Sequence, residues 1–346
     1  MESLVGQTIG KYQIIEELGK GGTAVVYRGL DVDLARNVAI KVMLPNRQES
    51  VKSLRRFTLE ARKLAQMSHP NIVMVWDYGE YNNVPYLVME YIPGGTLQEQ
   101  MNRVYSVKEA ANLLIPVGNA LHYAHQKARI VHRDIKPSNI LFNDSGQPLI
   151  TDFGIAKLID AEESQGITGT GVLIGTPTYM SPEQIQGKTI DARSDVYSLG
   201  VMFFEMVTGH KPYTANTPIE VSLKHVNDPI PRPRQYQKDI SPDAEVVIMK
   251  AMAKKPEDRY ADMAAFVSAM EDLLSGKKQR GKPGKTATSS EEPSEQPTKK
   301  KQMPVWLIVV PVLLVALGVA GFLLRSNGQA STAPTSLPVA ETTLPT

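Results

Sequence analysis

The sequence HRDIKPSN at residues 132–139, followed by DFG at residues 152–154, decides the fold that we expect for this chain. Between the two motifs lie an apolar run, 139–142, and a polar turn, Asn143-Asp144-Ser145-Gly146. Residues of this kind form tight turns, so the second motif is expected to fold back towards the first. Either motif alone would also fit a solvated, charged loop, but that reading does not explain both motifs in this order and at this spacing.

Four polar side chains of these motifs have complementary chemistry. Asp134 can orient and deprotonate a hydroxyl group, and Lys136 can neutralise a phosphoryl group in transfer. Asn139 and Asp152 offer oxygen ligands for Mg²⁺. The motifs resemble the H-R-D-L-x-x-x-N and D-F-G sequences of the eukaryotic-type (Hanks-type) Ser/Thr protein kinases.

This resemblance covers about residues 10–275 and implies an α+β, bilobal protein kinase fold. A β-rich N-terminal lobe with one helix is expected at 11–92, after a short segment, 1–10. A mainly helical C-terminal lobe is expected at 93–275, with the activation segment at 152–183. The implied reaction transfers the γ-phosphoryl group of ATP to protein Ser or Thr hydroxyls, with Mg²⁺ or alternatively Mn²⁺ as the metal, and includes autophosphorylation.

Composition is compatible with this reading and excludes some others. The chain has 346 residues, a net charge of +2 and no cysteine. It therefore has no overall basic field for nucleic acid, no disulfide and no thiolate metal site. Its first residues contain neither a basic region nor an apolar run, so we expect no secretory signal.

Two β-rich runs flank the glycine cluster at 19–24 and predict a hairpin. Glycines let the backbone approach phosphates closely, although a plain hairpin turn is the simpler interpretation of this loop alone. The strand 38–41, VAIK, supports the kinase reading because it carries a single lysine, Lys41. Ala24 stands where the family has its third glycine. Lys41 could instead be a charge that protects a sheet edge.

The resemblance implies a set of ATP contacts on the loop, its strands and the segment between the lobes. Backbone groups of Glu90 and Ile92 would bind adenine, and Met89 would gate the pocket behind it. The full set is Leu18, Gly19, Lys20, Gly21, Gly22, Thr23, Ala24, Val25, Val26, Ala39, Lys41, Met89, Glu90, Ile92 and Leu141.

The apolar spacing of residues 51–68 predicts a helix that carries Glu60. By resemblance, Glu60 pairs with Lys41, and this pair forms only when the helix swings inward. The resemblance counts both residues, together with Asp134 and Lys136, among the catalytic residues. A local partner for Glu60, Arg62 or Lys63, is the alternative.

Further helices are predicted in the second lobe. Ser106 and Glu109 form a capping box that opens an amphipathic helix from 107 to about 127. The stretch 195–204 is apolar nearly all round and predicts a buried central helix, and a last helix is expected at 261–274. His122 and His125 are interpreted as ordinary core or surface histidines.

The resemblance also implies structural roles. His132 and Phe153 would stack with Leu64 and Val75 between the lobes. Asp195 would accept backbone N–H bonds from the catalytic loop. Glu183 would form an ion pair with Arg259.

Residues 155–180 are rich in Gly, Thr and Ser and show no periodicity. Segments of this length are usually functional or disordered. Thr168 and Thr170 are the candidate phosphorylation sites, whose phosphate Arg133 would receive. The alternative is a flexible loop with incidental threonines.

The C-terminal part is expected to be a basic juxtamembrane linker, 276–302, a transmembrane helix, 303–324, and a short tail, 325–346. The apolar stretch is long enough for a hydrocarbon core of about 30 Å. Lys299, Lys300 and Lys301 place the kinase domain in the cytoplasm and the C-terminus outside, with membrane lipid as a further partner of the linker. The tail is too short for a sensor module. The family also includes homodimers paired through their N-lobes, but no residue pattern here predicts one.

Two other classes remain open. A pseudokinase scaffold would keep the fold but lose Lys41, Asp134, Asn139 or Asp152, and all four are present. A membrane-tethered binding module would tolerate neutral changes at those positions.

Overall fold

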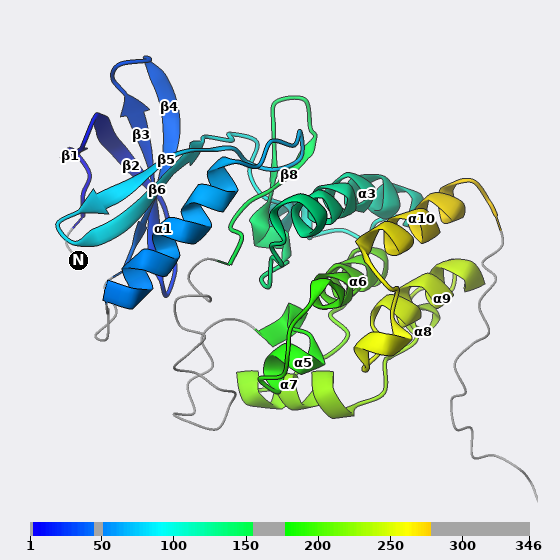
Figure 1. The fold of residues 1–346 in the computed structure, drawn as a ribbon. Helices are drawn as coiled ribbons and strands as arrows, with labels where there is room; N and C mark the ends of the chain where they lie inside the picture. The colour runs from blue at the N-terminus through cyan, green and yellow to red at the C-terminus, as the bar shows by residue number, and fades with distance from the viewer. Residues whose placement is uncertain (1–2, 45–50, 155–176, 278–346) are drawn as a thin grey trace, which may run out of the picture. The chain divides into compact units, whose positions relative to one another are not determined.

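The computed structural model describes residues 3–44, 51–154 and 177–277, except for the side chains of residues 51–56. These residues belong to the first of two compact units into which the chain divides, Met1–Gly284. Within this unit a β-sheet with one helix is followed by a group of helices (Figure 1). The bilobal fold expected from the sequence is therefore confirmed.

The N-terminal lobe is built on a six-stranded antiparallel sheet. Its order is β1-β2-β3-β4-β6-β5, and α1 (Val51–Ala65) packs beside β5 and β6 (Figure 1). Asn82 and Asn83 join β5 to β6 with φ of 50° and 64°, the left-handed conformation that a tight hairpin turn requires. The strands are β1 (Thr8–Ile9), β2 (Tyr12–Lys20), β3 (Ala24–Asp31), β4 (Arg36–Met43), β5 (Val75–Tyr81) and β6 (Val84–Glu90).

Strand β4 divides its side chains between two apolar clusters, because alternate residues of a strand point to opposite faces. Val38, Ile40 and Val42 belong to a cluster confined to the N-terminal lobe. Ala39 and Met43 belong to the larger cluster, which continues into the helical lobe. Lys41 follows the second alternation, so this pattern directs its amine towards the helical lobe.

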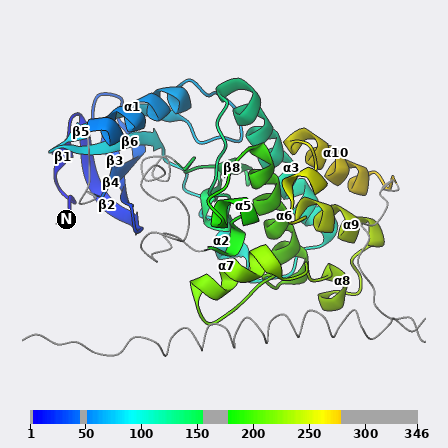
Figure 2. The same cartoon turned by 60° about the horizontal axis from the view of Figure 1, so that its bottom comes forward.

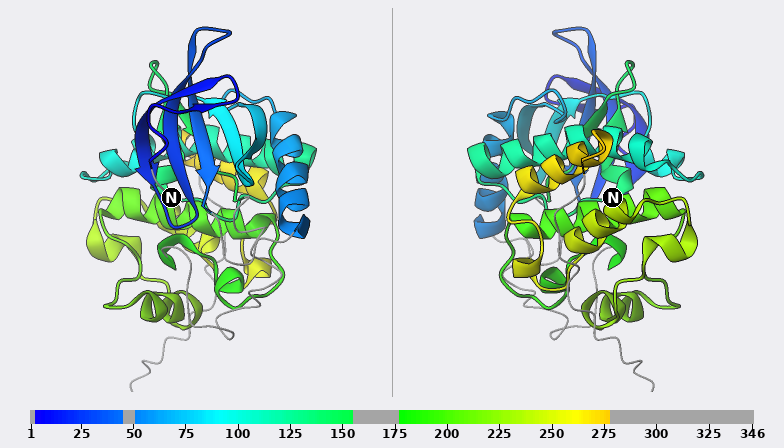
Figure 3. Two further views of the ribbon diagram at one scale, coloured as in Figure 1. Left: turned by 90° about the vertical axis from the view of Figure 1, so that its left-hand side faces the viewer. Right: turned by 90° about the vertical axis from the view of Figure 1, so that its right-hand side faces the viewer.

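The C-terminal lobe is organised around α6 (Ala192–Thr208), whose residues are buried from Ser194 to Thr208. Helices α3 (Val107–Tyr123), α9 (Pro242–Ala251) and α10 (Met263–Leu274) pack against it, and α10 lies alongside α3 (Figures 2 and 3). A Cβ atom at Gly200 would lie 2.7 Å from the Ala251 Cβ, so only glycine allows this approach of α6 and α9. The other described α-helices of this lobe are α2 (Leu97–Gln100), α5 (Pro182–Ile185), α7 (Pro218–Asn227) and α8 (Pro233–Tyr236).

Helix α3 begins as its sequence predicts. The Glu109 N–H donates to Ser106 Oγ at 3.2 Å, and the Ser106 N–H donates to Glu109 Oε2 at 2.8 Å. The α-helix ends at Tyr123, and the chain continues as one π-helical turn, Ala124–Ala128. The predicted end near 127 therefore includes this wider turn, which carries His125.

Backbone hydrogen bonds connect the N-terminal lobe, and the segment by which the chain leaves it, to the short hairpin of β7 (Ile140–Phe142) and β8 (Pro148–Ile150). The Val73 N–H donates to the Ile150 carbonyl at 3.0 Å, and the Ile150 N–H donates to the Asn71 carbonyl at 2.9 Å. The Gly94 N–H donates to the Phe142 carbonyl at 3.0 Å. A Cβ atom at Gly94 would lie 2.2 Å from that oxygen, so glycine is required where the chain crosses between lobes.

Among the described residues, no helix combines the length and the apolar character needed to cross a bilayer. The predicted membrane segment, 303–324, lies outside the described residues, as do the tail, 325–346, and all of the linker except Gly276 and Lys277.

Candidate active site

A buried carboxylate holds the loop that carries Asp134. Asp195, in the first turn of α6, accepts the His132 N–H at 2.8 Å and the Arg133 N–H at 2.9 Å. The His125 Nε2 atom lies 2.8 Å from the same carboxylate. Burial opposes ionisation of Asp195, but the hydrogen bond and charge of His125, with the His132 contacts, outweigh it and lower the pKa of this carboxyl group. The role expected for Asp195 is confirmed.

His125 is a residue that the sequence reading missed. The sequence interpretation treats it as an ordinary core or surface histidine, and the structure shows that it supplies the side-chain partner of Asp195. Helical periodicity gave no signal for it, because the residue lies in the π turn after α3 rather than on a regular helix face.

The predicted residues of the catalytic loop lie together. Lys136 Nζ is 2.9 Å from Asp134 Oδ2. The short 3₁₀ turn Pro137–Asn139 returns the Asn139 amide to Asp134, where Nδ2 donates to the main-chain carbonyl at 2.7 Å and to Oδ2 at 3.2 Å. The Asp134 carboxylate is therefore oriented by a cation and an amide from its own loop.

Asp152 and Phe153 occupy different environments, as expected. The Phe153 ring is buried 4.6 Å from the ring centre of His132, and Leu64 and Val75 belong to the same apolar cluster. Burial lowers the pKa of His132, which favours a neutral ring. His132 Nε2 lies 2.9 Å from the Thr151 carbonyl, and Nδ1 accepts the Asp134 N–H at 3.3 Å. This ring therefore connects the two motifs.

The pairing of Lys41 differs from the expectation. Its Nζ atom lies 2.8 Å from Asp152 Oδ1, while the Glu60 carboxylate pairs with Lys63 at 2.7 Å. Residues three apart on a helix are neighbours, so Lys63 reaches Glu60 without any movement of α1. Arg62 Nε also donates to the Tyr78 hydroxyl at 2.9 Å and links α1 to β5. The local alternative for Glu60 is the one that this structure contains.

Only some of the residues predicted to contact ATP have side chains on the same face of the sheet as Lys41. Ala24, Ala39 and Met89 belong to the large cluster on the Lys41 face, and Val26, Ile92 and Leu141 pack against it. Val25 is buried in the other cluster with Val42, so its side chain lies on the sheet face opposite to Lys41, and its contact with ATP stays a prediction. Residues 18–22 are exposed, and the Gly21 N–H closes the turn on the Ala24 carbonyl at 2.8 Å.

The polar residues fit a magnesium ion bound together with phosphates. Because Asn139 Nδ2 donates to Asp134, its amide oxygen is the atom that can face a cation. Asp152 presents a carboxylate, and Mg²⁺ commonly takes one or two protein carboxylates and completes its shell with phosphate and water oxygens. The described residues contain no cluster of three or more His, Cys, Asp or Glu side chains suited to a metal.

The end of the activation segment is anchored as predicted. Arg259 donates to both oxygens of Glu183 at 2.7 Å, and Ser194 Oγ donates to the same carboxylate at 2.5 Å. Burial raises the pKa of Glu183, but the hydrogen bonds and charge of Arg259, together with the Ser194 hydrogen bond, outweigh burial and lower the pKa overall. Thr168 and Thr170 lie outside the described residues.

Residues 12–271 match the family model described as the protein kinase domain. The chain belongs to the protein kinase family. It is 39% identical over 275 residues to the serine/threonine-protein kinase PrkC of Bacillus subtilis, covering 78% of this chain and 42% of PrkC. It is 38% identical over 273 residues to the serine/threonine-protein kinase PknB of Mycobacterium leprae, covering 77% of this chain and 43% of PknB. The chain thus spans about two fifths of the length of these curated relatives.

Solved kinase domains have the same fold. The crystal structure of the PknI kinase domain of Mycobacterium tuberculosis is 26% identical with a TM-score of 0.61, and the match covers 78% of this chain and 98% of that one.

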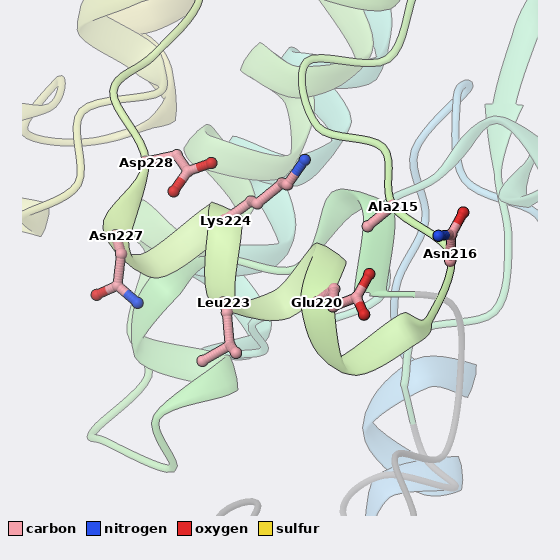
Figure 4. A pocket seen from close by; sticks show the side chains of 7 residues that line it. All are labelled: Ala215, Asn216, Glu220, Leu223, Lys224, Asn227 and Asp228. Carbon is pink, nitrogen blue, oxygen red and sulfur yellow. The ribbon is translucent and has the colours of Figure 1, made fainter.

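Away from the catalytic loop, this chain has a pocket at α7. It is lined by Ala215, Asn216, Glu220, Leu223, Lys224, Asn227 and Asp228 (Figure 4). None of these is a predicted site residue.

We expect Glu183→Ala to lower the free energy of unfolding by about 3–5 kcal/mol at pH 7, because it leaves the buried Arg259 guanidinium without a counter-charge. Urea titration measures this loss, and exposed Glu271→Ala on α10 is the control, within about 0.5 kcal/mol of wild type. Since the pKa of Glu183 is lowered in the folded state, its contribution is present above the ordinary value of 4.5 and is lost as the pH falls through the folded value. A loss below about 1 kcal/mol at pH 7 would contradict the structural role of the pair.

We expect Lys63→Gln to tighten binding of Mg-ATP about twofold, because an exposed pair three residues apart on a helix is worth about 0.3–0.5 kcal/mol. Without the Lys63 ammonium group, the Glu60 carboxylate is available to pair with Lys41. Titration calorimetry measures the affinity, and Lys108→Gln on the exposed side of α3 is the control. Weaker binding by the Lys63 variant would show that Lys63 supports the nucleotide site rather than competing with it.

Proposed function

We propose that this chain is a serine/threonine-protein kinase that transfers the γ-phosphoryl group of ATP to protein hydroxyls. The observation that carries the proposal is the held position of Asp134: Asp195 binds the two preceding N–H groups, and Asn139 and Lys136 contact its carboxylate. Kinase relatives at nearly 40% identity support the same activity. Protein substrates and the chain itself would be the acceptors.

In the reaction, Asp134 accepts the proton of the Ser or Thr hydroxyl, whose oxygen forms the new bond to the γ-phosphorus. The bond between that phosphorus and the β–γ bridging oxygen breaks, and ADP leaves. Lys136, held next to Asp134, neutralises charge on the group in transfer. Lys41 binds the α- and β-phosphates once it exchanges Asp152 for Glu60. Asn139 and Asp152 would hold Mg²⁺, which when bound neutralises charge along the phosphates.

Positioning and charge neutralisation therefore supply most of the acceleration, as is general for phosphoryl transfer. General-base assistance by Asp134 contributes about 10²–10⁴-fold.

Asp134→Asn is expected to lower phosphate transfer by about 10²-fold or more, because an amide cannot accept the hydroxyl proton. The full chain, labelled ATP, Mg²⁺ and a generic Ser/Thr-rich acceptor protein make up the assay. Asp144→Asn, in the exposed turn between β7 and β8, is the matched control and should retain wild-type activity. If wild type transfers no phosphate to itself or to the acceptor under varied metal and pH, the pseudokinase scaffold is favoured instead.

Phosphates mapped to Thr168 and Thr170 would support activation-segment autophosphorylation, and phosphates confined to 276–302 would contradict it.

We also propose that residues 303–324 anchor the kinase in the cell membrane, with the catalytic domain in the cytoplasm. The support is the uncharged apolar stretch itself and the lysines at 299–301 on its N-terminal side. The basic linker, 276–302, would then lie near anionic headgroups.

Flotation of the full chain with lipid vesicles tests the anchor. The full chain should float with the vesicles and stay bound to them in high salt, while a version with Leu313, Leu314 and Leu317 changed to Asp should be released in high salt. Release of the wild-type chain by salt alone would reject a spanning helix and leave only the lysines as a membrane contact.

A further inference from the structure

Gln184, on α5, makes three hydrogen bonds that join two parts of the site. Its Oε1 atom accepts the Ser181 N–H at 3.0 Å and the Ser181 hydroxyl at 3.0 Å. Because a backbone N–H can only donate, this contact assigns the oxygen of the amide. The nitrogen, Nε2, therefore donates to the Arg133 carbonyl at 2.8 Å.

The Arg133 carbonyl belongs to the peptide that leads directly into Asp134. Arg133 has a φ of 66°, in the left-handed region that costs a non-glycine residue about 1 kcal/mol or more. Its N–H is bound by Asp195 from α6, and its carbonyl is bound by Gln184 from α5. Two neighbouring helices, both more than 50 residues further along the chain, thus hold both polar groups of the strained residue that precedes the base.

The Ser181 side of Gln184 is itself fixed. The Ser198 hydroxyl donates to the Tyr179 carbonyl at 2.7 Å, and Glu183 is bound by Arg259. A displacement of the segment around Ser181 would therefore be transmitted to the Arg133 carbonyl through a single side chain.

We propose that Gln184 is a positioning residue that fixes the Asp134 carboxylate for proton transfer and couples it to the segment 177–183. The inference rests on the proposed kinase activity. A capping box accepts Glu or Gln equally, so the bond to Ser181 alone does not require an amide. Only an amide accepts from Ser181 and donates to Arg133 at neutral pH, which separates the positioning role from the capping role.

Gln184→Glu and Gln184→Met in the full chain test this assignment. Both should lower kcat about tenfold at pH 8, as expected when a hydrogen bond worth about 1.4 kcal/mol is lost, with KM for ATP within about twofold of wild type. In the Glu variant, the ratio of its kcat to that of wild type should recover as the pH falls, because a protonated carboxyl group can again donate to the Arg133 carbonyl. The Met variant should show a ratio that does not change with pH.

Exposed Gln186, two residues further on, supplies the matched controls Gln186→Glu and Gln186→Met, which should keep the wild-type kcat. The inference is overturned if both Gln184 variants stay within twofold of the wild-type kcat, or if the deficit of Gln184→Glu is the same at every pH. If wild type transfers no phosphate, the proposed function fails instead. Gln184 is then judged by hydrogen exchange at the Asp134 amide, which Gln184→Met should accelerate about tenfold and which an unchanged rate would overturn.

Discussion

The active site of this protein kinase depends on one buried carboxylate. Asp195 lies in the first turn of the central helix α6 and accepts two consecutive N–H groups of the catalytic loop, and His125 supplies its side-chain partner. A buried charge is tolerated only when it is paired and hydrogen-bonded, and this one has three such contacts. Because α6 is the most completely buried helix of the lobe, hydrogen bonds to it hold the catalytic loop firmly against the core. The position of Asp134 is therefore set by packing.

A second feature is that the charged residues of the site neutralise one another. Lys41 pairs with Asp152, Lys136 with Asp134, and Glu60 with Lys63. Each of these pairs is partly exposed, so each is individually weak and easily exchanged. A nucleotide with several phosphates offers Lys41 stronger anions than one carboxylate. The same residues can thus form one set of pairs in this structure and another set during catalysis, while the backbone that holds Asp134 stays in place.

Much of the architecture could be predicted from sequence because it depends on local patterns and ordered motifs. The capping box at Ser106 needs only two residues three apart, and the burial of α6 follows from its continuous apolar sequence. The pair between Glu183 and Arg259, 76 residues apart, was predicted from family resemblance and not from any pattern in the chain. The spacing of residues along the sequence does not by itself predict a contact between residues so far apart.

The misses have physical reasons as well. Val25 is counted among the ATP contacts by family resemblance, whereas strand alternation places its side chain on the sheet face opposite to Lys41. The partner of Glu60 depends on the position of α1, which helical periodicity does not determine. His125 lies in a π-helical turn, and Gln184 binds the carbonyl of Arg133, a residue in the left-handed conformation. Neither conformation has a sequence signature of its own.

A crystal structure of the full chain with Mg²⁺ and a non-hydrolysable ATP analogue tests the central claim most directly. The account predicts that Asp195 keeps its hydrogen bonds to the His132 and Arg133 N–H groups, with Asp134 unmoved, while Lys41 leaves Asp152 and pairs with Glu60. A complex in which the nucleotide is bound but the Asp195 bonds are broken and the catalytic loop is rebuilt would contradict it.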